Sequence, residues 1–363
     1  MEMLIRSCSQ AVSLPVPTRR TIEPSHEPAG LAESRDYASR PKYHGAKALR
    51  IMKLYDFPNF GASNPWQWKT IDTAAPMPVV RSSIWRPPSD ASLIHVGWEH
   101  YLFKPCRTAA EAESRAHQVV ASLEQCRRRG VRILWTLHNL TAHAMPWKRA
   151  EQIVREWLAE RAAVVFLMSE KHRLLFPSIP ASKIWIVPHY IDRNPYLAQR
   201  ETAPDRFGFF KFGAPRDDRD TELLDAILSS RRFACHVSDM RVAVERTDDD
   251  VILQRRFTIE EALRYAARSH FAIFVRNPVL NSGVLNFYCG SRLAVFHTAE
   301  SVKHLDLPPG LERFVMTDQN LHARHILETL ASTPLPGDEL ADWLTERSAD
   351  RVSHRWWQAA LSA

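Results

Sequence analysis

The sequence predicts an α/β protein with two sheet-containing domains. Apolar, strand-like runs alternate with helical patterns, and this alternation stops at a polar, proline-containing segment and then starts again. The length of 363 residues also exceeds what one hydrophobic core usually holds. We therefore expect two successive Rossmann-like domains with a cleft between them, where ligands of open α/β sheets bind at the carboxyl ends of the strands.

The first domain is expected over residues 47–196. It follows an extension, residues 1–46, that is rich in Pro, Ser, Arg and Glu and has no apolar periodicity. The apolar runs predict strands at residues 48–57, 92–98, 132–138, 164–169 and 184–189. Helical patterns cover residues 109–129 and 147–163, and a further helix is expected to start at residue 169.

The second domain is expected over residues 197–340, where the linker 192–206 gives way to a new alternation. Strands are expected at residues 207–214, 234–239, 250–257, 271–276 and 293–297, and helices at 220–230, 258–269, from about 282, and at 320–332. The remaining segment, residues 341–363, is an amphipathic helical pattern that carries three tryptophans. Since indoles are costly to leave in water, we expect this helix to pack back on the first domain.

The charge of the chain indicates an anionic partner. The net charge is +7 and the pI is about 9.3, which suits nucleic acid, an anionic membrane surface or a phosphate-bearing substrate. No DNA- or RNA-binding motif is recognisable, so a nucleic-acid-binding protein is the less favoured alternative. No apolar run reaches about 18 residues and the first residues do not resemble a secretory signal, so a cytoplasmic location is expected.

The stretch "RILWTLHNLTAHAMPW", residues 132–147, ends a buried strand with two histidines. Three interpretations compete: a metal site, a cleft-lining loop, and ordinary core or capping histidines. His138 and His143 are five residues apart, whereas two ligands on one helical face need a spacing of about four and a third ligand. No metal is therefore expected, and the other two interpretations stay open.

A second candidate site lies in "FKFGAPRDDRDTELLDAI", residues 210–227. Gly213 permits a tight turn after a strand, and Arg216 and Arg219 follow just before a helix. Arginine side chains beside the N–H groups of a helix N-terminus can bind a phosphate or diphosphate. The alternative is that both arginines pair with the neighbouring aspartates at 217, 218 and 220.

A third candidate is "NPVLNSGVL", residues 277–285. Ser282 can cap a helix, and the N–H groups after it, beginning with Gly283, would face any anion in the cleft. A plain helix cap explains the same residues. Beside the arginine turn, at the same edge of the sheet, the segment becomes the second half of a diphosphate pocket.

These three segments, in this order and spacing, resemble motifs of the GT-B glycosyltransferases. The resemblance is strongest to bacterial exopolysaccharide β-mannosyltransferases of the xanthan-assembly type, and covers about residues 49–298. Two earlier segments, "SNPW" at residues 63–66 and "ASLIHVGWEHYLF" at residues 91–103, are also similar to segments of that family. The resemblance implies a GT-B fold, in which the helix at residues 341–363 returns to the first domain.

The resemblance further implies a hexosyltransferase that moves mannose from GDP-mannose, with inversion, to a polyprenyl-diphosphate-linked oligosaccharide. The enzyme would need no metal and no cofactor, and would lie peripherally on the inner face of the cytoplasmic membrane. Several positions depart from the family pattern. Arg219 and Asp220 replace a lysine and a glycine, Gly97 replaces a histidine, Ala144 replaces an acid, and the Glu-x7-Glu carboxylate pair is missing. UDP-glucose or UDP-glucuronate as donor, or a catalytically degenerate protein, are therefore kept as alternatives.

Site residues follow from the same resemblance. Candidate catalytic residues are Glu99, His100, His138 and His143. Candidate diphosphate-binding residues are Gly213, Arg216, Arg219, Asn281, Ser282 and Gly283, and candidate cleft-lining residues are Asn64, Trp98, Asn139 and Asn277. Inversion by direct displacement needs a single base. If Glu99 is that base, the change Glu99→Gln is expected to abolish transfer while donor binding persists.

Overall fold

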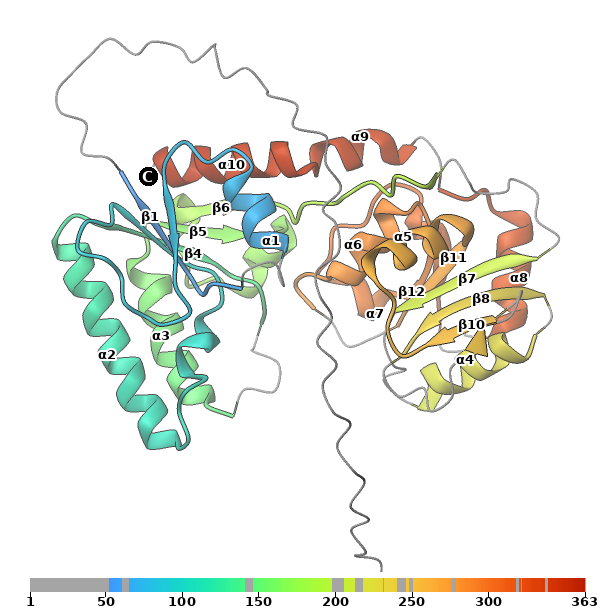
Figure 1. Ribbon diagram of the computed structural model, residues 1–363, viewed down its shortest axis with the longest axis horizontal. Helices are drawn as coiled ribbons and strands as arrows, with labels where there is room; N and C mark the ends of the chain where they lie inside the picture. The colour runs from blue at the N-terminus through green and yellow to red at the C-terminus, as the bar shows by residue number, and fades with distance from the viewer. Residues whose placement is uncertain are drawn as a thin grey trace, which may run out of the picture. The chain divides into compact units, whose positions relative to one another are not determined.

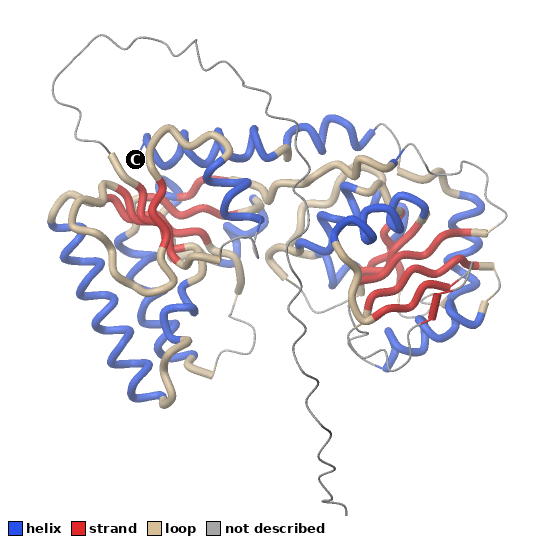
Figure 2. Tube along the Cα trace, viewed as in Figure 1, coloured by secondary structure: helices blue, strands red, loops and turns tan. Residues whose placement is uncertain are grey.

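The computed structural model describes residues 52–60, 65–140, 146–197, 206–212, 218–230, 232–239, 246–247, 251–275, 279–317, 320, 322–336 and 339–362. Residues 218–220, 246–247 and 339 are described by their backbone alone. All of these residues belong to one unit that spans residues 49–363. Their strands form two separate sheets, each with helices packed against it (Figures 1 and 2).

The first lobe, residues 52–197, is built on a parallel sheet in the order β2-β1-β3-β4-β5-β6. Its strands are β1 (Leu54–Phe57), β2 (Val79–Arg81), β3 (Leu93–Val96), β4 (Arg132–Thr136), β5 (Val164–Leu167) and β6 (Ile184–Ile186). Its helices are α1 (Pro65–Gln67), the π-helical turn η2 (Trp68–Asp72), α2 (Ala109–Arg128), α3 (Lys148–Arg161) and the 3-10 turns η3 (Glu99–Phe103), η4 (Glu170–Leu175) and η5 (Ala181–Lys183).

Both faces of this sheet are covered, which is why its strands read as apolar runs rather than alternating ones. One set of strand side chains, including Tyr55 and Ile94, packs with the buried side chains of α2 and α3. Strand side chains on the opposite face, including Leu54 and Leu134, pack with a tryptophan just before η2, Trp66, and with two tryptophans of the C-terminal helix. Helix α2 begins where Thr108 accepts a hydrogen bond from the Glu111 N–H, a capping interaction the sequence makes available.

The second lobe, residues 206–336, is built on a sheet in the order β13-β12-β11-β7-β8-β10-β9. Its strands are β7 (Phe207–Phe212), β8 (Phe233–Ser238), β9 (Arg246–Thr247), β10 (Val251–Gln254), β11 (Phe271–Phe274), β12 (Ala294–Thr298) and β13 (Val315–Met316). All neighbouring strands are parallel except β9 and β10. Its helices are α4 (Asp218–Ser229), α5 (Ile259–Arg268), α6 (Gly283–Gly290), α7 (Ala299–Val302), the 3-10 turn η7 (Leu311–Phe314) and α8 (Ala323–Ser332).

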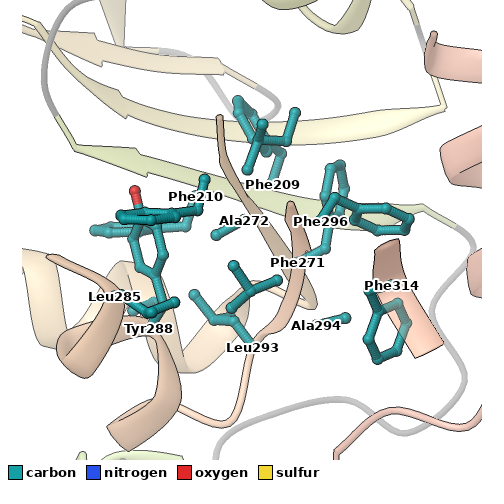
Figure 3. Close-up of a cluster of buried hydrophobic side chains, with 14 of the residues drawn as sticks. Phe209, Phe210, Phe271, Ala272, Leu285, Tyr288, Leu293, Ala294, Phe296 and Phe314 are labelled. Carbon is teal, nitrogen blue, oxygen red and sulfur yellow. The ribbon is translucent and has the colours of Figure 1, made fainter. Parts of the chain in front are cut away.

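Aromatic side chains dominate the core of the second lobe, and they fix helix α6 against the sheet. Figure 3 shows Leu285 and Tyr288 of this helix beside Phe210, with Phe271 and Phe296 further along the core. The Tyr288 hydroxyl also accepts a hydrogen bond from the Phe212 N–H at the end of β7, at 3.1 Å. Because both apolar packing and a hydrogen bond hold α6, the position of its N-terminus is well defined.

The C-terminal segment, residues 339–362, returns to the first lobe, as the sequence predicts. The indole of Trp357 donates a hydrogen bond to the Ile71 carbonyl at 2.7 Å, and the Trp356 ring stacks on Phe166 with 5.0 Å between centroids. The expected single helix is in fact two, α9 (Glu339–Glu346) and α10 (Ala349–Ser362), separated by Arg347 and Ser348. Figure 1 shows α10 lying over strands of the first lobe.

Two other expectations from the sequence need correction. The helix expected to start at residue 169 is a 3-10 helix of six residues, η4, which ends before Phe176 and Pro177. The short strand β2, the turns between residues 65 and 72 and the short elements β9, α7, η7 and β13 were not expected, because none has a strong apolar period. The domain boundaries drawn from the sequence stay predictions.

His236, on strand β8, makes the stability of the second lobe depend on pH. Its ring is buried, contacts Ser269 Oγ at 3.0 Å and stacks on Tyr265. Burial, with a smaller effect of Arg268, lowers the pKa of His236 from 6.5 to about 4. Between these values the unfolded chain binds a proton that the folded chain does not, so stability is complete above pH 6.5 and falls towards pH 4.

We therefore expect the change His236→Asn to flatten the dependence of stability on pH. A shift of this size corresponds to about 3 kcal/mol over the window. Urea unfolding at pH 7, 5.5 and 4.5 measures it, and the asparagine amide keeps a hydrogen-bonding partner for Ser269. A variant whose free energy of unfolding falls with pH as steeply as that of the unmodified protein would contradict the assignment.

Candidate functional site

A pocket lies where residues from both lobes and the C-terminal segment meet. It encloses about 360 Å³ of empty space, counting its open mouth. The first lobe contributes residues that follow β5 and β6, namely Met168, Ser169, Pro188 and His189. The other lining residues are Leu280, Asn281, Ser282, Leu285, Asn286, Leu305, Asp306 and Arg347. The pocket therefore lies at carboxyl ends of strands, as expected for an open α/β sheet.

The cap residue and two further residues of α6 line this pocket. Ser282 is the cap residue, and its hydroxyl accepts a hydrogen bond from the Leu285 N–H at 3.2 Å. The Asn286 N–H bonds to the Ser282 carbonyl, which leaves the N–H groups of Gly283 and Val284 without an acceptor among the described residues. Free N–H groups and the positive end of a helix dipole favour a bound anion. The helix cap expected at Ser282 is present, and the diphosphate pocket expected from the sequence stays a prediction.

Asn281 connects the second lobe to the predicted histidine of the first. Its side-chain amide donates a hydrogen bond to the backbone carbonyl of His138, at 2.7 Å. Three other hydrogen bonds link the lobes close by. Ser169 Oγ donates to Asp306 Oδ1 at 2.6 Å, Lys171 Nζ donates to the Leu305 carbonyl at 2.7 Å, and the His172 Nε2 contacts the His304 carbonyl at 2.9 Å.

His138 is a buried, neutral imidazole next to this connection. Its ring lies flat on Trp98, with 3.7 Å between centroids and 6° between planes, and edge-on to Trp66. Burial, followed by the charges of nearby histidines, holds the pKa of His138 well below its usual 6.5. Its Nε2 atom is buried and has no hydrogen-bond partner among the described residues. From the sequence, His138 was a candidate catalytic residue and Trp98 a candidate cleft-lining residue, with no contact between them predicted. A core or capping histidine and a cleft-lining histidine were both left open.

A buried polar network lies beneath these rings. His95 contacts Asp56 Oδ1 through Nδ1 at 2.8 Å and Thr136 Oγ1 through Nε2 at 2.7 Å. Gln67 and Arg81 donate to the other oxygen of Asp56, at 3.1 and 2.8 Å. The three strand residues are fully buried, so the network fixes the carboxyl ends of β1, β3 and β4. The network was not predicted, although a polar residue inside each of the apolar runs "LYDF" and "LIHV" was a usable signal.

Glu99 occupies a different environment from that of an exposed catalytic base. Its carboxylate is buried, forms an ion pair with Arg155 of α3, and accepts a hydrogen bond from the Trp135 indole at 3.4 Å. Arg155 also pairs with Glu151 at 3.1 Å and donates to the Asn139 carbonyl at 2.8 Å. Glu99 therefore supports the loop after β4 through Arg155, and its assignment as the base stays a prediction that this geometry does not favour.

The remaining candidates differ in how much of each residue the structure describes. His100 is half-buried in η3, where its ring contacts that of Tyr101, and the half-exposed Asn139 follows β4. Five candidates lie outside the described residues: Asn64, His143, Gly213, Arg216 and Asn277. For Arg219 only the backbone, in the first turn of α4, is described. The predicted arginine half of the diphosphate pocket therefore stays a prediction.

Two further groups of pocket residues were not predicted from the sequence. One follows strands of the first lobe, and the other lies in the connections that hold Asp306 and Arg347. Ser169 and His189 each come directly after an apolar run, which is the position where a parallel sheet presents its ligand-binding residues. Asp306 and Arg347 have no such signal, because they lie in connections whose course depends on the fold. Within the described part of the chain, no group of three or more His, Cys, Asp or Glu side chains could hold a metal ion, and no helix is long and apolar enough to cross a membrane.

Comparison with known proteins gives a fold and no family. No family model and no curated protein matches the chain. Among solved structures, HepE of Anabaena in complex with UDP and glucose matches with a TM-score of 0.56 and 11% identity, over 86% of this chain and 100% of HepE. The trehalose-6-phosphate synthase OtsA has a TM-score of 0.45 and 11% identity, over 75% of this chain and 72% of OtsA. A putative UDP-N-acetylglucosamine 2-epimerase from Listeria monocytogenes has a TM-score of 0.45 and 10% identity, over 85% and 94%.

The HepE match extends over both lobes, and at this level of identity it is evidence about fold alone. Together with the two parallel sheets, it confirms the fold class predicted from the sequence. The chain has a GT-B type α/β fold, with two Rossmann-like lobes and a C-terminal helix that returns to the first.

Proposed function

We propose that the protein is a glycosyltransferase that uses a sugar nucleotide, and that the pocket at the N-terminus of α6 binds the donor. The observation that carries the proposal is that Ser282, the cap residue of α6, lines a pocket formed by both lobes, next to the N–H groups of Gly283 and Val284, which have no acceptor among the described residues. A nucleoside diphosphate is an anion that such N–H groups bind. The solved structure of HepE, which shares the fold, contains UDP and glucose.

In this proposal a base removes the proton of an acceptor hydroxyl as its oxygen bonds to the anomeric carbon of the sugar. The bond between that carbon and the diphosphate oxygen breaks, and its electron pair stays on the leaving diphosphate. The α6 N–H groups stabilise the charge that develops there. His138, His100 and His143 are the candidate bases of this proposal. Burial keeps His138 neutral at neutral pH, but by lowering its pKa well below 6.5 it also makes the imidazole a weak base. His143 lies outside the described residues.

The proposal for the donor has a general part, its chemical class, and a specific part, its sugar and base. In general terms the proposed donor is a nucleotide-linked hexose. More specifically, GDP-mannose is the donor that the sequence resemblance favours. UDP-glucose is the second candidate, because the solved HepE structure that shares this fold contains UDP and glucose.

The proposed acceptor is a lipid-linked oligosaccharide precursor of a bacterial exopolysaccharide, used at a membrane surface. The charge distribution supports an anionic partner for the first lobe. Residues 47–196 contain 21 Lys and Arg against 12 Asp and Glu, whereas residues 197–340 contain 18 against 21. A positive first lobe is attracted to phosphate-bearing lipids without any spanning helix.

The test is to measure nucleotide binding by the variants Gly283→Pro and Gly283→Ala. Proline suits the first position of a helix, and Ser282 already has the extended conformation that proline requires before it. The proline variant thus lacks one N–H group but should keep the fold, and the alanine variant keeps the N–H group. A Cβ added at this glycine would have no other atom within 4 Å, so the alanine variant has no steric clash there.

We expect the unmodified protein to be stabilised against heat by GDP or UDP and by the matching sugar nucleotide, from a set of GDP-mannose, UDP-glucose and UDP-glucuronate. Gly283→Pro should weaken that binding about tenfold, the value of one charge-assisted hydrogen bond, and Gly283→Ala should not. If none of these nucleotides raises the melting temperature of the unmodified protein, the proposed function is wrong.

A further inference from the structure

Arg347 places a positive charge in the pocket from outside both lobes. It lies between α9 and α10 and its side chain is 14% exposed. The guanidinium lies over the Trp343 ring at 4.1 Å, and the backbone carbonyl of Arg347 accepts a hydrogen bond from the Ile191 N–H at 2.7 Å. Both contacts hold the residue in place at the edge of the pocket.

Most of the hydrogen-bonding capacity of Arg347 is unused. A guanidinium has five N–H donors, and this one makes a single hydrogen bond within the described part of the chain, from Nη2 to Asp306 Oδ2 at 3.2 Å. The other oxygen of Asp306 accepts from Ser169. Asp306 therefore orients the guanidinium from one side and leaves its remaining donors for a ligand.

Arg347 and Asp306 are the two charged side chains among the described residues that line the pocket. Their charges offset one another, so the empty pocket is close to neutral and an anion needs a further source of attraction. The N-terminus of α6 provides it, since Ser282 lines the same pocket. A diphosphate carries enough oxygen atoms to bond with the helix N–H groups and with the fork of an arginine at the same time.

We propose that Arg347 is a donor-binding residue that contacts the diphosphate of the sugar nucleotide, opposite the N-terminus of α6. The proposal rests on the proposed function and deepens it, because it adds a cation that the sequence motifs did not indicate. It also predicts that Asp306 weakens diphosphate binding by competing for the guanidinium. A purely structural ion pair would have no such effect.

The experiment measures the binding of UDP, GDP, uridine and guanosine by calorimetry for the unmodified protein and for Arg347→Gln and Asp306→Asn. We expect Arg347→Gln to weaken binding of the diphosphate at least about tenfold and to leave binding of the corresponding nucleoside unchanged. We expect Asp306→Asn to tighten binding of the diphosphate, because the asparagine oxygen can still accept from Ser169 while the competing charge is gone. The two variants thus change affinity in opposite directions.

The matched control is Arg351→Gln, on α10, whose side chain is 54% exposed, pairs with Glu346 and does not line the pocket. It should bind nucleotides as the unmodified protein does. Equal losses of nucleoside and diphosphate binding in Arg347→Gln, or no loss, would overturn the role of Arg347. If Arg347→Gln does not fold, Asp306→Asn decides, since unchanged or weaker binding overturns the proposal. Failure of the unmodified protein to bind any of the four ligands would instead overturn the proposed function itself.

Discussion

Replacing Arg155 by methionine is expected to lower the free energy of unfolding by about 3–5 kcal/mol, the usual cost of removing one partner from a buried ion pair. Arg155 lies between two buried carboxylates, Glu99 and Glu151, whose side chains are 3% and 6% exposed. Methionine keeps an unbranched apolar stem but leaves both carboxylates without this partner. The same change removes the hydrogen bonds from Arg155 to the carbonyls of Asn139 and Leu140.

Urea unfolding measures this loss, and Arg161→Met on the same helix is the control. The side chains of Arg161 and its partner Glu160 are 48% and 67% exposed, so that pair should contribute less than about 1 kcal/mol. If Arg155→Met is as mild as the control, the buried network is not what holds the loop after β4.

The change Glu99→Gln separates a structural role of this network from a catalytic one. Arg155 keeps Glu151 as its partner in this variant, and the glutamine oxygen can still accept from Trp135, so the loss of stability should be much smaller than in Arg155→Met. Because Glu99 is buried and already paired, we expect transfer activity to persist. Complete loss of transfer with unchanged stability and unchanged nucleotide binding would restore Glu99 as the base.

The change Gly290→Ala should destabilise the protein by about 4 kcal/mol or more, which is exceptional for the addition of one methyl group. A Cβ at this position would lie 2.1 Å from the backbone carbonyl oxygen of Asp192 and 3.1 Å from Ile191 Cγ2. The Gly290 carbonyl also accepts the Asn194 N–H, so the segment after β6 is held directly against the C-terminus of α6. Because the obstacle is backbone, no side-chain rotation can relieve the clash.

The matched control lies at the other end of the same helix. Gly283→Ala adds the same methyl group where nothing lies within 4 Å, and alanine is the better helix former, so its stability should be unchanged or slightly higher. The difference in the free energy of unfolding between the two variants, measured by urea unfolding, tests how tightly the segment near Asp192 packs against α6. A difference below about 1 kcal/mol would show that the segment near Asp192 can move aside at little cost.

The sequence predicted the larger elements well for a physical reason. Strands such as β4 and β11 are buried on both faces and therefore read as unbroken apolar runs. The cap at Ser282 was predictable because a serine before an apolar helix is a local signal. Residues whose role depends on distant segments were not predictable. Glu99 was predicted from the sequence as a candidate catalytic base, whereas its ion pair with Arg155, 56 residues away, is visible only in the structure.

The same limit explains why most of the residues that line the pocket were missed. Asn281 and Ser282 belong to a recognisable motif, whereas Asp306 and Arg347 reach the pocket only because α9 and α10 follow a particular path. Arg347 interrupts what reads as one amphipathic period from residue 339 to 361, and no local pattern predicts that break. Such positions can be assigned to the pocket only from the three-dimensional structure of both lobes.

The return of α10 to the first lobe sets an order for how the chain can mature during synthesis. Strand β1 leaves the ribosome early, yet the apolar cluster around Leu54 and Phe166 is completed by Trp356 and Trp357, nearly three hundred residues later. Until then that cluster lacks two large aromatic side chains and exposes apolar surface, the condition under which partly synthesised chains aggregate or recruit chaperones. The core cluster of the second lobe is drawn mainly from its own residues but also includes Leu340 and Leu344 of α9, so both lobes receive their last core side chains from the C-terminal segment.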